Sequence, residues 1–213
     1  KIAVLNSFLW NIDKSILLNI DLICHGVPSI KLFKSYIHWL ELKYGEPITD
    51  YNFRDKSAGW GLNCKIKTKT KVRIKSCTID PYYYHFLKGD TYRECCYRCL
   101  YSIPERVGDV TIGDFWGIES IIPEFFSKKG VSCLTLNTPK AMSLIPILDS
   151  MFSVKDVLLN NVMKFQGNLV APTPRPDMRN SVYKLLDEKD LETFFGIVLA
   201  YPPDFKAEIK ALL

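Results

Sequence analysis

The amino-acid sequence predicts an α/β fold, with a mixed sheet flanked by helices and a helical C-terminal extension. The first observation is the order strand, turn, helix over residues 16–44, which is the building unit of α/β proteins. The second is that residues 48–76 and 109–114 alternate apolar and polar side chains as strands do. The 213 residues, 47% of them hydrophobic, are enough for one well-packed domain with a small appendage.

The chain begins with a predicted helix and a predicted strand. Residues 1–9 space their apolar side chains as a short helix does, and residues 16–24 form an apolar run that we interpret as a buried strand. This strand would carry Cys24 at its carboxyl end, where ligands gather in α/β units. Ser29 is a suitable N-cap for a helix whose apolar positions follow the 3.6-residue period until Gly45.

Three strands and an aromatic helix are predicted next. The strands cover residues 48–54, 62–67 and 71–76, and a lysine-rich turn joins the last two. Asp80-Pro81 opens a helix over residues 82–87, and we expect its aromatic rings to pack into the core.

The second half of the chain adds further predicted elements. After the strand at residues 109–114, another strand ends at Asn137 and places Cys133 in the core. A helix over residues 139–152 and a last strand at residues 154–159 follow.

The predicted domain organisation follows from a proline-rich stretch near the C-terminus. Helical patches near residues 179–198 and 204–213 follow this stretch. We therefore expect one domain over residues 1–178 and a helical extension over residues 179–213.

Composition and charge exclude some classes of protein. No apolar run approaches the roughly 18–20 residues that a membrane span needs, so we expect none. The net charge is +5, and the lysine-rich residues 65–75 are more typical of a solvated hairpin face than of a nucleic-acid contact. Seven cysteines without a secretory leader indicate a reducing cytoplasm, where closely spaced cysteines bind metal or do redox chemistry more often than they form disulfides.

The cysteines predict a metal or redox site. Cys99 has two possible partners close by, Cys95 and Cys96. A Cys-x-x-Cys pair, with Cys24 brought in from a distant turn, suits a soft metal or an iron-sulfur centre because thiolates donate strongly to iron and zinc. Neighbouring arginines favour the thiolate form. The alternative is that these cysteines pack as small apolar side chains.

Six segments, in this order and spacing, resemble one family. They are residues 21–29 (DLICHGVPS), 52–56 (NFRDK), 80–83 (DPYY), 96–99 (CYRC), 112–117 (IGDFWG) and 129–132 (KGVS), the last followed by Asn137-Thr138. Together they resemble the C-terminal domain of the beta subunit of deazaflavin-coenzyme-reducing hydrogenase and its dehydrogenase relatives. The resemblance runs from the first residues to about Arg179.

The resemblance implies an iron-sulfur flavoprotein, an oxidoreductase subunit that passes electrons between a 4Fe-4S cluster, FAD and a deazaflavin or another redox partner. By the same resemblance, Cys24, Cys96 and Cys99 are the cysteines expected to ligate the cluster. A redox partner protein or domain is expected as well.

The chain departs from the family pattern at its start. Relatives usually carry Thr-Pro-Cys immediately before the segment that aligns with Lys1, so we expect an N-terminally truncated domain. If that cysteine is the fourth ligand, the site here is incomplete, and His25, Cys95 or Asp114 could substitute for it.

A turn at a strand end is the candidate site for the flavin, because a ring or a pyrophosphate could lie against its backbone and a cation could neutralise phosphate. The candidate residues are Gly113, Asp114, Trp116, Gly117, Lys129 and Ser132. The alternative is that Phe115 and Trp116 only fill the core.

The sequence is also compatible with two other functions, and it contains arginines that could change the reduction potential of a bound cluster. A zinc-stabilised or metal-free module of the same fold would be a non-catalytic scaffold, and the lysine hairpin could contact nucleic acid. If a cluster is bound, Arg93, Arg98 and Arg106 would raise its reduction potential.

Overall fold

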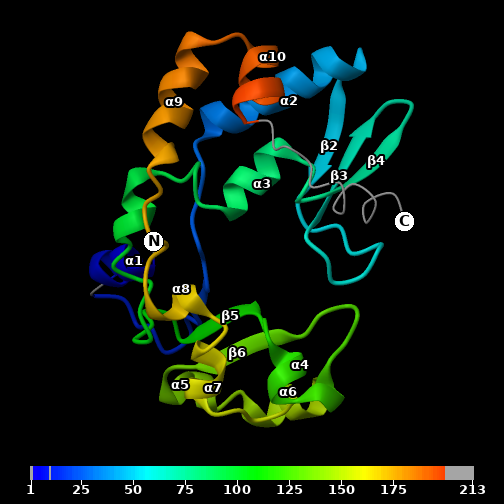
Figure 1. Ribbon diagram of the computed structural model, residues 1–213. Coiled ribbons are helices and arrows are strands. Elements are labelled where there is room, and N and C mark those ends of the chain that lie inside the picture. Colours follow the sequence, from blue (N-terminus) through cyan, green and yellow to red (C-terminus); the bar gives the residue numbers. More distant parts are fainter. Residues whose placement is uncertain (1, 10, 200–213) are drawn as a thin grey trace. The chain divides into compact units, whose positions relative to one another are not determined.

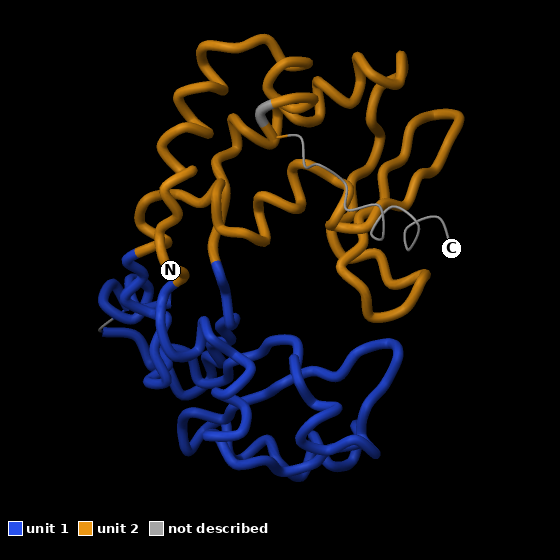
Figure 2. Tube along the Cα trace, in the orientation of Figure 1, with its two compact units in different colours: residues 1–25, 98–172 blue, residues 26–97, 173–213 orange. Residues whose placement is uncertain are grey.

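The computed structural model describes residues 2–9 and 11–199, and the chain folds into two compact units (Figures 1 and 2). Each unit contains one three-stranded sheet and several helices, which confirms the predicted α/β class. The units are made of residues 1–25 with 98–172 (unit 1) and residues 26–97 with 173–213 (unit 2).

Unit 1 holds a mixed sheet, as predicted. Its strands are β1 (Ile20–Leu22), β5 (Val110–Asp114) and β6 (Ser132–Leu136), in the order β1-β5-β6. β1 runs parallel to β5, and β6 runs antiparallel to it. The helices of this unit are α1 (Ile2–Phe8), α4 (Ile118–Ile121), η2 (Pro123–Phe125), α5 (Pro139–Met142), α6 (Ile145–Met151), α7 (Leu159–Met163) and α8 (Gly167–Val170).

β1 is an edge strand, so the prediction of a buried strand over residues 16–24 is wrong. Ile20 is 53% exposed and Leu22 is 60% exposed. Among the described residues β1 pairs with β5 alone, and Ile20 and Leu22, which are two residues apart and so share one face of the strand, are both exposed on that face. The pairing does continue as far as Ile23, whose N–H donates to the carbonyl of Ile112 at 2.9 Å. The strand therefore ends next to Cys24, as the sequence predicts.

Two other predictions in this unit need correction. The single helix expected over residues 139–152 is divided into α5 and α6, because Pro146 has no N–H and its ring clashes with the carbonyl four residues earlier, at Met142. The strand expected at residues 154–159 does not form: residues 153–158 have no regular structure, and α7 begins at Leu159.

Unit 2 contains an antiparallel sheet and most of the long helices. Strands β2 (Ile48–Asn52), β3 (Asn63–Thr68) and β4 (Val72–Ser76) pair in that order. The helices are α2 (Ile30–Tyr44), α3 (Pro81–Leu87), η1 (Glu94–Arg98, a 3-10 helix whose last residue is counted with unit 1), α9 (Met178–Glu188), α10 (Leu191–Thr193) and η3 (Phe194–Val198). The helix expected at residues 204–213 lies outside the described residues, and the boundary expected after residue 178 stays a prediction.

Both predicted helix starts in unit 2 are capped by side chains. The Ser29 hydroxyl accepts from the N–H of Leu32 at 3.2 Å, and the Asp80 carboxylate accepts from the N–H of Tyr83 at 2.9 Å. Gly45 ends α2 with φ 65°, a left-handed conformation that glycine adopts without steric cost. Local sequence signals therefore fix these boundaries.

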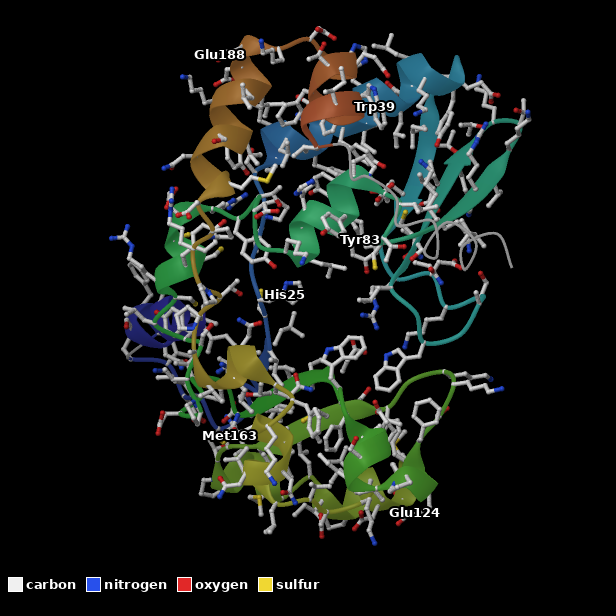
Figure 3. All side chains as sticks on the ribbon, viewed as in Figure 1. His25, Trp39, Tyr83, Glu124, Met163 and Glu188 are labelled. Carbon is white, nitrogen blue, oxygen red and sulfur yellow. The ribbon has the colours of Figure 1, made fainter. Side chains whose placement is uncertain are left out.

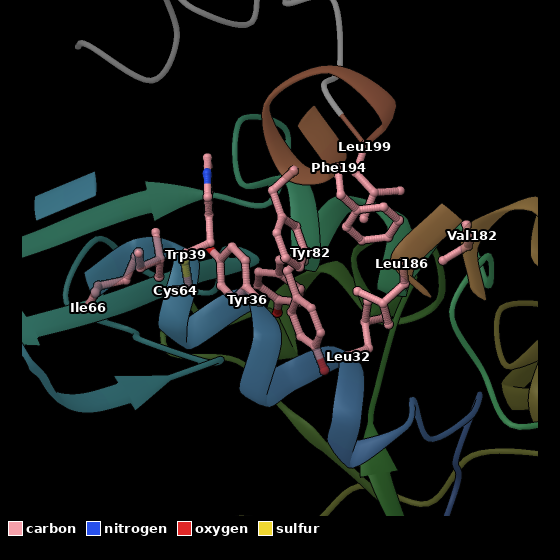
Figure 4. Packing of buried hydrophobic residues seen from close by; sticks show 13 residues of the cluster. Leu32, Tyr36, Trp39, Cys64, Ile66, Tyr82, Val182, Leu186, Phe194 and Leu199 are labelled. Atoms are coloured by element: carbon pink, nitrogen blue, oxygen red, sulfur yellow. The ribbon is translucent and has the colours of Figure 1, made fainter. Parts of the chain in front are cut away.

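The core of unit 2 is aromatic and is built on α2 (Figure 4). Tyr36 of α2 stacks on Tyr82 of α3, with ring centroids 5.1 Å apart. Tyr82 and Tyr83 are both buried, which confirms that the aromatic helix packs its rings into the core; Figure 3 labels Tyr83 on α3. The buried cluster comprises Leu32, Tyr36, Trp39, Leu40, Cys64, Ile66, Tyr82, Tyr83, Val182, Leu186, Phe194, Phe195 and Leu199.

One carboxylate is buried in this core. Asp80 is fully buried and accepts a hydrogen bond from the Tyr36 hydroxyl as well as from the backbone of α3. Burial, followed by the negative charge of Asp80, raises the pKa of Tyr36 well above its usual value. Tyr36 therefore stays protonated and can donate to the carboxylate.

The helices of the described part of the chain, residues 2–9 and 11–199, differ from membrane-spanning helices. None of them has the length and the apolar character that crossing a bilayer requires.

Candidate functional site

The cysteine turn in unit 2 is held against the segment that follows Cys24. Within η1, the N–H of Cys96 donates to the carbonyl of Arg93 at 2.9 Å. The N–H of Val27 donates to the Cys96 sulfur at 3.4 Å, and the N–H of Arg93 donates to the carbonyl of Val27 at 2.9 Å. Pro28 and Tyr92 form an antiparallel bridge next to these contacts. Hydrogen bonds thus join residues 27–28 to residues 92–96, two segments that lie about seventy positions apart in the sequence.

Gly26 permits this close pairing. Its φ is 153°, and a Cβ atom at this position would lie 2.2 Å from Cδ2 of Tyr92. Any other residue would collide with the Tyr92 ring and would also adopt a strained backbone conformation.

The three predicted ligands are distributed over both units. Cys24 is exposed and Cys99 is half-buried in unit 1, while Cys96 is half-buried in unit 2. His25 is half-buried in the segment that leads from β1 to α2 (Figure 3). Among the residues that the structure describes, no three His, Cys, Asp or Glu side chains are grouped so that they could hold a metal ion.

Cys64, Cys77 and Cys133 have surroundings that disfavour the thiolate. Burial, with a smaller contribution from the charge of Asp80, raises the pKa of Cys64 to about 12. Burial alone raises the pKa of Cys133 to about 11, and it also raises the pKa of Cys77. Cys133 is buried, as predicted. A thiol that stays protonated at neutral pH is a poor metal ligand.

Two arginines that no local sequence pattern indicates contact the cysteine turn and the residues before it. The Arg175 guanidinium donates to both carboxylate oxygens of Glu94, at 2.9 and 2.8 Å. Arg179 donates from Nε to the carbonyl of Tyr92 at 2.6 Å. Glu94 adjoins the cysteine pair in the sequence, but its partner lies 81 positions away, so no local pattern could have revealed it.

In unit 1, Arg106 binds the strand that leads to Cys24. Its Nη2 donates to Asp21 at 3.1 Å and to the carbonyl of Leu22 at 2.9 Å, and its Nη1 donates to the carbonyl of Tyr101. The charge of Arg106 is therefore paired with a carboxylate.

Four of the six flavin candidates lie at one end of the unit 1 sheet. Asp114 ends β5 and pairs in register with Ser132, the first residue of β6. The N–H of Trp116 donates to the carbonyl of Asp114 at 3.1 Å. Lys129 is exposed in the turn that precedes β6, where its N–H donates to the side chain of Ser127 at 3.2 Å. Asp114, Trp116, Lys129 and Ser132 are thus contributed by two neighbouring strands and their flanking turns.

The two glycine candidates contact other side chains of the protein. A Cβ at Gly113 would lie 2.9 Å from the side chain of Ile23, and a Cβ at Gly117 would lie 2.3 Å from the ring of Phe165. Both glycines therefore lie close against other side chains of unit 1, with no room for a side chain of their own in that direction. Phe115 is buried, as the core-filling alternative predicts, whereas Trp116 is half-buried.

Comparison with known proteins identifies one family. The family model for the C terminus of the beta subunit of coenzyme F420 hydrogenase/dehydrogenase matches residues 2–155, which is more than half of the chain. Neither the curated proteins nor the solved structures gave a match.

Proposed function

The chain belongs to the family of coenzyme F420 hydrogenase/dehydrogenase beta subunits, whose C-terminal domain it matches, and from this we propose that it is an electron-transfer subunit of an oxidoreductase. In this proposal it acts in the cytoplasm and exchanges electrons with a redox partner protein or domain. A deazaflavin or another hydride acceptor takes part in the overall reaction.

The proposal assigns Cys24, Cys96 and Cys99 as thiolate ligands of a 4Fe-4S cluster. The observation that supports this assignment is that the three proposed ligands are exposed or half-buried, whereas Cys64 and Cys133 are buried and their pKa values are raised to about 12 and 11. Burial therefore disfavours Cys64 and Cys133, and the family resemblance favours the three proposed ligands over Cys95, which is also exposed. Thiolates are the usual ligands of such clusters, so the chemistry of the donor set fits.

The backbone at Cys96 supports the same assignment. A bound 4Fe-4S cluster supplies storage and release of single electrons. The N–H of Val27 donates to the Cys96 sulfur at 3.4 Å, and a contact of this kind raises the reduction potential of a ligated centre. The exposed Arg93 and Arg98 are proposed to add to this effect, as is the paired Arg106.

The test is the cofactor content of the 213-residue chain after anaerobic purification and cluster reconstitution. We expect roughly four iron and four sulfide per chain and a brown spectrum. Cys96→Ser and Cys99→Ser should lose most of the iron, whereas Cys95→Ser, at the neighbouring exposed cysteine, should retain it.

Other outcomes would contradict the cluster assignment. A colourless, folded chain after reconstitution would do so, and so would retention of all iron in Cys96→Ser. Zinc in place of iron would favour the scaffold function.

FAD is the second cofactor in the proposal. We place its contacts at the end of the unit 1 sheet, with Lys129 facing phosphate. The contacting residues in this proposal are Gly113, Asp114, Trp116, Gly117, Lys129 and Ser132. Lys129→Ala should weaken FAD binding by roughly tenfold, which is the loss of one charge-assisted contact. Titration of the variant with FAD measures this change, and Lys128→Ala, at the adjacent exposed lysine, is the control. Equal affinities of the two variants would argue against this placement.

A further inference from the structure

Three side chains of one C-terminal segment, residues 175–183, bind the backbone and side chains that flank Cys96. All of these residues belong to unit 2. The segment begins after residue 155, where the family match ends. It therefore adds contacts from a part of the chain that the family match does not cover.

The first contact fixes the residue at the start of η1. Arg175 binds the Glu94 carboxylate through Nε and Nη2, at 2.9 and 2.8 Å, in the two-pronged geometry that gives the strongest charge-assisted hydrogen bonds. Arg179 Nη2 lies 3.8 Å from the same carboxylate. Glu94 is two residues before Cys96, so this contact limits the movement of the cysteine turn.

The second contact fixes the strand that leads into the turn. Arg179 donates from Nε to the carbonyl of Tyr92 at 2.6 Å, and its guanidinium lies 3.8 Å from the centre of the Tyr183 ring. Tyr92 is the residue whose ring lies against Gly26. Arg179 therefore holds the point where the two cysteine-bearing segments meet.

The third contact joins those two segments directly. The Tyr183 hydroxyl donates to the carbonyl of Thr91 at 2.6 Å and accepts from the N–H of Ser29 at 3.1 Å. Ser29 follows Val27 by two residues, and Val27 donates to the Cys96 sulfur. One hydroxyl thus bridges the segment that carries the donor amide and the segment that carries the cysteine.

We propose that Arg175, Arg179 and Tyr183 are positioning residues, which hold the Cys96 thiol against the Val27 amide. Their relevance to cluster binding rests on the proposed function. Their effect on the thiol itself does not, because every contact involved joins groups of the protein itself.

The experiment is site-resolved alkylation of the metal-free, full-length chain, with each cysteine followed by mass spectrometry. Arg175→Ala, Arg179→Ala and Tyr183→Phe should each accelerate the alkylation of Cys96 by about tenfold, because each removes a restraint on local opening. Arg175→Lys, which keeps the charge but loses the two-pronged contact, should give an intermediate rate.

Cys64 and Lys184 provide the controls. Cys64 is fully buried in the same unit, so it reports unfolding of the whole unit, and its rate should not change. Lys184→Ala alters an exposed ion pair on the same helix and should leave Cys96 unchanged. Unchanged Cys96 rates in all three variants would overturn the proposal, as would parallel increases at Cys96 and Cys64, which indicate general destabilisation.

A second readout separates this proposal from the proposed function. In the reconstituted chain, the same variants should lose iron to a chelator several-fold faster than the unaltered chain does. If the unaltered chain takes up no iron, the cluster assignment fails, and the alkylation rates still decide whether the three residues position Cys96.

Discussion

The cysteines of this protein differ in chemistry because their surroundings differ. Cys96 is half-buried, and its sulfur accepts from the N–H of Val27 and donates to the carbonyl of the same residue. Cys64 and Cys133 are buried, and burial raises the pKa of each thiol. At the scale of single residues, the structure therefore identifies Cys64 and Cys133 as core cysteines, and the remaining five cysteines are exposed or half-buried.

Gly26 gives a direct test of the pairing at Cys96. Gly26→Ala should lower the free energy of unfolding by about 2–4 kcal/mol, because the new methyl group collides with the Tyr92 ring in a conformation with positive φ. Urea unfolding followed by circular dichroism measures the loss. Gly45→Ala is the matched control: its φ is also positive but no atom lies within 4 Å of the added Cβ, so about 1 kcal/mol is expected. If the two variants lost the same free energy of unfolding, contact with the Tyr92 ring would not be the reason that position 26 requires glycine.

The lowered pKa of Asp55 predicts that the stability of the protein depends on pH. Hydrogen bonds, chiefly from Lys65 and then from Ser57, lower the pKa of Asp55 from 3.8 to about 2. Because the folded-state pKa is below the unfolded-state value, the stabilisation is present above the unfolded-state pKa and is lost as the pH falls toward about 2. Asp55→Asn should therefore reduce the acid sensitivity of unfolding below about pH 4, as measured by urea midpoints from about pH 7 to about pH 2. The same pH profile in both proteins would contradict this.

At the scale of elements, the two N-caps differ: one only caps its helix, and the other also accepts a hydrogen bond inside the core. Ser29 caps α2 through its hydroxyl, and Asp80 caps α3 through its carboxylate. Asp80 also accepts from the Tyr36 hydroxyl inside the aromatic core. The sequence indicates both helix starts, but it does not indicate that the second cap is also a buried hydrogen-bond acceptor.

The two caps should therefore differ in their contribution to stability. Ser29→Ala should cost about 1 kcal/mol, the usual value for a lost N-cap. Asp80→Ala should cost about 2–4 kcal/mol, because it also leaves the buried Tyr36 hydroxyl without its acceptor. Urea unfolding of the two variants measures the difference. A cost for Asp80→Ala no larger than that for Ser29→Ala would show that the Tyr36 contact adds nothing.

At the scale of the whole molecule, the hydrophobic burial is unequal between the units. The buried aromatic cluster belongs entirely to unit 2. In unit 1, β1 is exposed at the sheet edge and neither α1 nor α6 contains a buried residue. Unit 2 is therefore expected to be the more strongly protected part of the chain.

Hydrogen exchange tests this inequality. Peptides that cover β3 should exchange slowest, because Cys64 and Ile66 are fully buried and the strand is paired on both sides. Peptides that cover residues 16–24 should exchange much faster, since β1 pairs on one side only. Exchange followed by mass spectrometry gives both rates in one experiment. Similar protection in the two segments would contradict the unequal burial.

The sequence by itself determined the elements whose signals are local. The caps at Ser29 and Asp80, the period of α2 and the alternation over residues 48–76 are properties of neighbouring residues, and the structure confirms them. The six short motifs identified the family, and the family match confirms it. The assignment of Cys24, Cys96 and Cys99 as ligands stays a prediction.

Only the tertiary structure decided what depends on residues far apart in the chain. Whether the strand before Cys24 is buried depends on the elements that pack beside it and over its faces. The residues of the strand do not themselves indicate that it lies at the edge of the sheet. The contact of Arg175 with Glu94 spans 81 positions, and the contact of Val27 with Cys96 spans 69. Such pairs carry no local sequence pattern, because side-chain periodicity reports the face of one element and not the element that packs against it.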